Sequence, residues 1–209
     1  MREFQTQPNT NPKIRYLPYA GIGSRETPAR IQNLMNRIAY TFEKEGFILR
    51  SGGADGADSA FENGVVNNYN KEIYLPWNGF NGRYGVSNNP DGGLYTGYPT
   101  NEIAEEAYEY AKKFHPAWDR CSRGAKLMHA RNVSQILGWS LLEPSKFVVC
   151  WTPNGNLIGG TAQALRLANY FEVPVFNLGL PTDMESMTQM LDELKAFAKH
   201  IKDTEGEVK

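Results

Sequence analysis

The sequence has few cysteines, no long apolar run and almost no net charge, and each shortage excludes a class of protein. Its 209 residues include 2 cysteines, Cys121 and Cys150, which lack the CxxC spacing typical of a disulfide framework or a zinc site. No stretch reaches the roughly 18 apolar residues that a membrane-spanning helix needs. Residues 1–13 also lack the apolar segment of a signal peptide. We therefore expect a cytoplasmic protein that contacts no membrane.

The balance of charge disfavours a general attraction to nucleic acid. Lys and Arg number 22 against 23 Asp and Glu, which leaves a formal net charge of -1. Contacts with a phosphate backbone need clustered basic residues. Nucleic acid is therefore not expected as a partner.

The two best-known nucleotide motifs are missing as well. Gly21-x-Gly23 leads to Glu26 where the dinucleotide fingerprint has its third glycine, and no GxxxxGK[ST] occurs. Hydride transfer and P-loop hydrolysis are therefore disfavoured.

What the sequence does have is an alternation of apolar runs and stretches of helical periodicity. The runs at 16–23, 47–50, 72–75, 146–151 and 173–178 predict strands, with helices between them. This order predicts an α/β fold of Rossmann-like type, with an open, mainly parallel sheet and helices on both faces. Thr27 is expected to cap the first helix, Pro28 to begin it and Gly46 to end it. A single domain over residues 1–209 fits this length.

Residues 77–100 interrupt the pattern. They contain six glycines and several aromatic residues, over a length that compact domains seldom use as a plain connection. We interpret the segment as an inserted flap. Its aromatics, with Trp151, are candidates to stack on a base, and the alternative is that the flap aromatics pack at a contact between subunits. A final helix is expected over about 182–201.

Three glycine-containing turns follow predicted strands. In an open parallel sheet such turns share one edge, where helix N-termini offer free N–H groups to anions. Together they predict a site for a phosphate-bearing ligand. The candidate ligand-binding residues in these turns are Gly21, Gly23, Ser24, Arg25, Ser51, Gly52, Gly53, Gly159, Gly160 and Thr161.

The motifs GIGSRETP, RSGGADGADSAF, HARN and VVCWTPNGNLIGGTAQAL, in this order, resemble the SLOG superfamily, which contains the Smf/DprA proteins and the LOG phosphoribohydrolases. The YspA-like branch is the most similar, and the resemblance spans Tyr16 to Leu178 without the flap. It implies a Rossmann-like domain that binds nucleotides or their derivatives. In the phosphoribohydrolases the third turn leads to a catalytic glutamate, whereas this chain has Gln163 at or near that position.

Other carboxylates could take over the role of that glutamate. Asp55, Asp58 and Glu62 are spaced to share one helix face, where a carboxylate could stabilise an oxocarbenium-like state. The alternative is that Asp55 is an N-cap, Asp58 favours the helix dipole and Glu62 is solvated. Arg131 and Asn132 are further candidates, for phosphate and for a base or ribose edge.

These residues leave three functions open. The first is hydrolysis or transfer of the N-glycosidic bond of a nucleotide, and the second is a non-catalytic sensor or sequestering protein for a cyclic nucleotide or ADP-ribose type of signal. The third is single-stranded DNA binding in the DprA manner. A homo-oligomer is expected. No cofactor or metal is expected, because His, Cys and carboxylates show no ligand spacing; magnesium held by the aspartates is kept as an alternative.

Overall fold

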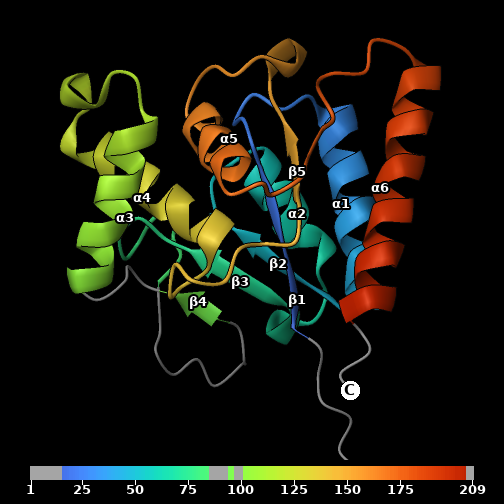
Figure 1. The fold of residues 1–209 in the computed structure, drawn as a ribbon, viewed down its shortest axis with the longest axis horizontal. Helices are drawn as coiled ribbons and strands as arrows, with labels where there is room; N and C mark the ends of the chain where they lie inside the picture. Colours follow the sequence, from blue (N-terminus) through green and yellow to red (C-terminus); the bar gives the residue numbers. More distant parts are fainter. Residues whose placement is uncertain (1–15, 85–93, 97–100, 206–209) are drawn as a thin grey trace, which may run out of the picture.

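The computed structural model describes residues 16–84, 94–96 and 101–205, which form one open sheet with helices on both sides (Figure 1). The strands, in chain order, are β1 (Leu17–Gly23), β2 (Phe47–Ser51), β3 (Lys71–Tyr74), β4 (Leu94–Thr96), β5 (Val148–Trp151) and β6 (Val175–Asn177). The α-helices are α1 (Ala29–Lys44), α2 (Ala57–Gly64), α3 (Asn101–Phe114), α4 (Arg123–Leu137), α5 (Thr161–Tyr170) and α6 (Met184–Glu205). Short 3-10 helices are η1 (Asn68–Asn70), η2 (Trp118–Arg120) and η3 (Pro153–Gly155).

The sheet confirms the predicted Rossmann-like architecture. Its strand order is β4-β3-β2-β1-β5-β6, and every neighbouring pair of strands is parallel. The chain moves outward from β1 to β4 and then returns to the other side of β1 with β5. In sheets of this kind, ligands bind beyond the strand ends where the direction of winding changes. Here that switch point lies between β1 and β5.

Two apolar clusters, one on each face of the sheet, hold the helices in place. Residues of α1, α2 and α6 build one cluster, and residues of α3, α4 and α5 build the other. Strand β1 serves both, because Leu17 and Tyr19 point to the first and Ala20 and Ile22 to the second. This alternation follows from the two-residue period of a strand and explains why its sequence is apolar throughout.

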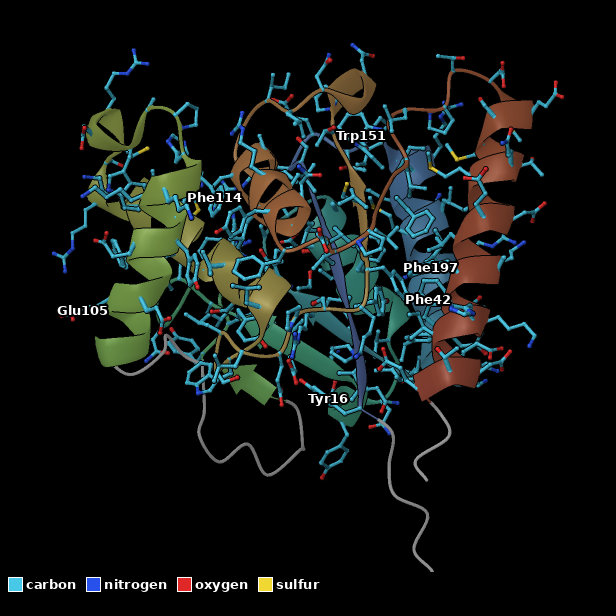
Figure 2. The ribbon with its side chains drawn as sticks, viewed as in Figure 1. Tyr16, Phe42, Glu105, Phe114, Trp151 and Phe197 are labelled. Atoms are coloured by element: carbon cyan, nitrogen blue, oxygen red, sulfur yellow. The ribbon has the colours of Figure 1, made fainter. Side chains whose placement is uncertain are left out.

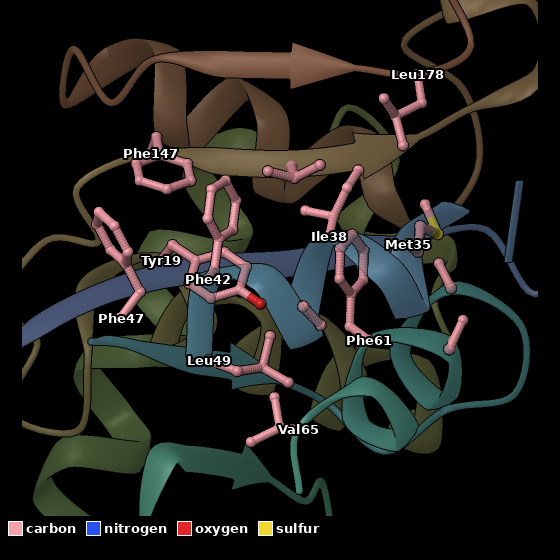
Figure 3. Packing of buried hydrophobic residues seen from close by; sticks show 14 of the residues in the cluster. Tyr19, Met35, Ile38, Phe42, Phe47, Leu49, Phe61, Val65, Phe147 and Leu178 are labelled. Atoms are coloured by element: carbon pink, nitrogen blue, oxygen red, sulfur yellow. The ribbon is translucent and has the colours of Figure 1, made fainter. Parts of the chain in front are cut away.

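Aromatic rings fill the centre of the first cluster (Figure 3). The ring centroid of Tyr19 lies 5.2 Å from that of Phe42 and 5.5 Å from that of Phe147. On the outer side, Phe197 of α6 lies 6.0 Å from Phe147, and Figure 2 shows it facing inward toward the sheet. The last helix is thus part of the core.

Two local predictions need correction. Thr27 does not cap α1: its hydroxyl donates to the Ser24 carbonyl, and Pro28 occupies the N-cap position without a side-chain cap. The sheet also has a sixth strand, β4, inside the predicted flap. The rest of the flap is described only for residues 77–84, so its remaining parts lie outside the described residues.

Among the described residues, no helix has both the length and the apolar character needed to cross a membrane.

Candidate functional site

A cavity of about 400 Å³ opens at the switch point between β1 and β5. Its walls come from the turns after these two strands, from the start of α5, from one face of α4, and from Ala54 and Asp58 around the start of α2. The lining residues are Ile22, Gly23, Ser24, Arg25, Glu26, Ala54, Asp58, Met128, His129, Arg131, Asn132, Gln135, Thr152, Pro153, Ile158, Gly159, Gly160, Thr161 and Ala164. The first and third predicted turns therefore meet in one place.

Backbone hydrogen bonds to β5 and to α2 hold the turn after β1 in place. The Ser24 N–H donates to the Trp151 carbonyl at 3.1 Å, and the Ser24 carbonyl accepts from Ala57 N–H at 3.2 Å. The Ser24 hydroxyl accepts from Glu26 N–H at 3.1 Å. Arg25, in contrast, is exposed, and its Nη2 lies 3.4 Å from Sδ of Met128 across the cavity, so its guanidinium can meet an anion at the mouth.

The start of α5 presents backbone rather than side chains to the cavity. A Cβ added to Gly159 or Gly160 would meet no atom within 4 Å, so a ligand can approach the main chain there. Asn132 of α4 donates from its side-chain amide to the Gly160 carbonyl at 3.2 Å and thereby fixes the turn. The first N–H groups of a helix have no partner within it, which makes this end suited to an anion.

Of the second predicted turn, residues 51–56, Ala54 lines the cavity, whereas Ser51, Gly52 and Gly53 do not, because Arg131 fills the space beside Gly52. A Cβ added to Gly52 would lie 1.2 Å from Nη1 of Arg131. The same Nη1 donates to Asp58 at 3.2 Å, and both side chains are buried. Burial raises the pKa of Asp58, while attraction to Arg131 opposes that rise. The absence of a side chain at Gly52 therefore leaves space for the Arg131 guanidinium.

Residues 77–84 cover the same turn from outside. Asn81 and Arg83 both donate to the Gly53 carbonyl, each at 3.0 Å. Arg83 also pairs with Glu62 at 3.0 Å between Nη2 and Oε2. The described part of the predicted flap therefore packs against the protein.

The three predicted catalytic carboxylates do not converge on the cavity. Asp58 lines it, but Glu62 is buried in its pair with Arg83, and Asp55 accepts a hydrogen bond from Asn81 at 3.3 Å. Asp55 is not an N-cap either, because Gly56 takes that position. Gln163 is fully buried and lies outside the lining.

Two further residues predicted to bind the ligand, Gly21 and Trp151, pack in or against the protein core instead. A Cβ added to Gly21 would lie 2.7 Å from side-chain atoms of both Leu49 and Phe61, so this glycine permits close packing in the core. Trp151 is half-buried at the strand end, packs against the core cluster and is absent from the lining (Figure 2).

Several lining residues of α4 are absent from the sequence-based prediction. Met128, His129 and Gln135 join Arg131 and Asn132 on the wall of the cavity. Burial, and then the neighbouring His115, lower the pKa of His129 to about 4, so its imidazole is neutral at pH 7. The signal in the sequence is the spacing, since residues 128, 131, 132 and 135 recur at the three- and four-residue intervals of one helix face.

No family model matches the chain, and no curated protein matches its sequence. Among solved structures, the chain resembles DNA processing protein A from Helicobacter pylori, described for its single-stranded DNA binding mode, with a TM-score of 0.46 and 15 % identity. The match covers 90 % of this chain and 81 % of that chain.

This match corrects one expectation. Nucleic acid was not expected as a partner because the net charge is balanced, yet the matched protein binds single-stranded DNA. A net charge near zero describes the whole chain and does not describe the charge around one site, so it does not exclude such a partner.

Proposed function

We propose that the cavity binds a phosphate-bearing nucleotide unit. The observation that carries this proposal is the meeting of the β1 turn, the β5 exit and the open start of α5 at the switch point of the sheet. Ligands of open α/β sheets bind at this place, and the exposed helix start attracts an anion.

Each wall of the cavity has a chemical role in this proposal. The phosphate lies at the backbone of Gly159, Gly160 and Thr161, with Arg25 at the mouth supplying positive charge. Asn132 donates to the Gly160 carbonyl, which leaves its own carbonyl oxygen as an acceptor for a base or ribose hydroxyl. Apolar contact comes from Ile22, Met128 and Ile158.

Calorimetric titration with nucleoside monophosphates tests the proposal. Gly160→Ala adds a methyl group at an open position with helical backbone angles, so we expect normal stability but affinity at least tenfold weaker. Gly124→Ala is the matched control, because Gly124 is also open and also lies at the start of a helix, α4, away from the cavity. Equal affinities in all three proteins would contradict the proposal.

A second candidate is that the nucleotide unit belongs to a single-stranded nucleic acid. Arg120, Arg123 and Lys126 lie just before the cavity-lining part of α4, and Asp119 is the one acidic residue between 118 and 137. This stretch forms a local basic segment despite the balanced net charge, and Met128, two residues after Lys126, contacts Arg25. Such a segment suits several phosphates in a row.

Fluorescence anisotropy with a labelled oligonucleotide at increasing salt separates the two candidates. For a strand, the logarithm of the binding constant falls with the logarithm of salt by about 0.7 for each phosphate contact, and Arg123→Gln should lower that slope by about this amount. Lys195→Gln, on the exposed side of α6, removes the same charge and should leave the slope unchanged. Tight binding of free mononucleotides with no oligonucleotide binding would reject the second candidate.

Cleavage of the N-glycosidic bond stays a separate prediction. Of the carboxylates predicted for it, Asp58 reaches the cavity, and it is paired with Arg131. Chromatography of a nucleoside monophosphate panel after incubation with the protein would show free base if the bond is cut. Base released by wild type and lost in Asp58→Asn would support catalysis, whereas recovery of unchanged ligand supports the sensor or sequestering alternative.

A further inference from the structure

A cluster of two histidines and one cysteine lies where α3, η2 and α4 meet. His115 follows α3, Cys121 follows η2, and His129 lies two turns into α4. One ligand atom from each, two ring nitrogens and the cysteine sulfur, all lie within 4.8 Å of one another. The sequence-based expectation of no metal-ligand spacing missed this cluster, because its three members come from three elements.

The separation of the Cys121 sulfur from the His115 nitrogens is close to that of two ligands on one tetrahedral metal ion. Sγ of Cys121 lies 3.7 Å from Nδ1 and 3.8 Å from Nε2 of His115. Zinc binds sulfur at about 2.3 Å and imidazole nitrogen at about 2.0–2.1 Å, so tetrahedral angles place the two ligand atoms about 3.6 Å apart. Because Sγ is nearly equidistant from the two nitrogens, it lies off the lone-pair axis of each, so the His115 ring has to rotate before one nitrogen can share an ion with Cys121.

His129 supplies an independent observation. Its side chain is buried, with the residue 6 % exposed, and its Nδ1 makes no hydrogen bond of normal geometry among the residues that the structure describes, although the buried side-chain amide of Gln163 interacts with the ring. Its ring centroid lies 4.3 Å from that of His115. A buried nitrogen without a well-formed hydrogen bond is costly, and coordination of a metal would satisfy it.

The surrounding residues hold the His115 side chain in place. The ring of Trp118, buried in η2, packs edge-on against Tyr108 and contacts His115. Nδ1 of His115 accepts a hydrogen bond from the Ala117 N–H at 3.2 Å. Coordination through this nitrogen would replace that one bond and leave the turn otherwise intact.

We propose that His115, Cys121 and His129 bind zinc or another late first-row divalent ion. Imidazole and thiolate are the ligands that these ions prefer, and they disfavour magnesium and calcium. With three protein ligands, the fourth position falls to water. Because His129 also lines the cavity, the ion would lie beside the proposed nucleotide site.

Cobalt titration of the reduced, chelator-treated full chain tests this site independently of nucleotide binding. We expect one Co²⁺ per chain and an absorption band from thiolate-to-cobalt charge transfer. Cys121→Ser should abolish the band, and His115→Gln should weaken binding at least tenfold. The chain offers matched controls in Cys150→Ala and His200→Gln, which lie outside the cluster and should keep the band.

A second measurement needs no variant. Zinc should slow alkylation of Cys121 by iodoacetamide in the wild-type chain, followed by mass spectrometry. Three results would each overturn the proposal. The wild type could show no band, the band could persist in folded Cys121→Ser, or Cys121 could be alkylated at the same rate with and without zinc.

Discussion

Gly52 is the residue on which the buried pair of Arg131 and Asp58 depends. A methyl group at this position would overlap the guanidinium, at 1.2 Å from Nη1. We therefore expect Gly52→Ala to displace Arg131 and to lower the free energy of unfolding by about 3–5 kcal/mol, the usual cost of breaking a buried ion pair. Urea denaturation measures it.

Gly124→Ala serves as the control for this substitution. It adds the same methyl group in open space near the start of α4, where alanine favours the helix by up to about 1 kcal/mol relative to glycine. A Gly52→Ala protein as stable as Gly124→Ala would show that Arg131 can leave its position without cost.

The two cysteines are expected to differ in reactivity. Cys150 lies in β5 with no exposed surface, and burial raises the pKa of its thiol far above the usual range. Cys121 is partly exposed. Since the thiolate is the reacting form, iodoacetamide at pH 8 should modify Cys121 in the folded, chelator-treated chain and leave Cys150 unmodified. Peptide mass spectrometry distinguishes them, and modification of both in urea is the positive control.

At the scale of elements, Arg50 links β2 to β3 and to the loop before β5. Its Nε donates to Glu72 at 2.9 Å and its Nη1 to the Glu143 carbonyl at 2.6 Å, although the residue is 0 % exposed. Tyr16 and Tyr74 also hydrogen-bond within this network. The charge of Arg50 is thus balanced inside the protein.

Arg50→Met should lower the free energy of unfolding by about 3–5 kcal/mol, because Glu72 then stays buried without its partner. The double variant Arg50→Met/Glu72→Met removes both charges and should recover a large part of this loss. Denaturation of the two single variants and the double variant forms a mutant cycle. An additive double variant would mean that the two residues are not coupled.

The sequence predicted the longer elements well, because burial leaves a clear pattern. The last helix, expected over about 182–201, and the apolar run expected at 146–151 appear within a few residues of these positions, as α6 and β5. Strand β4 has three residues in a glycine-rich stretch, too short for any period to be visible. The prediction that Thr27 caps α1 was wrong, because the turn brings its hydroxyl to the Ser24 carbonyl, to which it donates.

The site was predicted in part for a similar reason. Glycine turns after β1 and before α5 could be placed at one edge by topology alone. Nothing in the sequence indicates that Arg131, 79 residues beyond Gly52, fills the turn after β2, or that Arg83 holds Glu62. Such pairings depend on the path of the chain between distant residues.

At the scale of the whole molecule, association between copies stays a prediction. Leu157 and Leu180 are 50 % and 56 % exposed, and their loops touch, since a Cβ on Gly155 would lie 2.3 Å from Leu180. We expect sedimentation to show a homo-oligomer that Leu157→Ser/Leu180→Ser dissociates. Leu142→Ser, 82 % exposed in the loop between α4 and β5, is the control. A monomeric wild type would refute the expectation.

Arg131 in the turn after β2 also bears on the size of ligand that suits this protein. With that turn already neutralised and closed from within, the start of α5 is the remaining glycine cradle open to an anion. Of two adjacent phosphates in one compound, the first would bind at the start of α5 and the second would remain in solvent. If the ligand is a free nucleotide, as in the first candidate function, the protein should bind phosphate monoesters more tightly than diphosphates and dinucleotides, whereas the strand-binding candidate predicts the reverse.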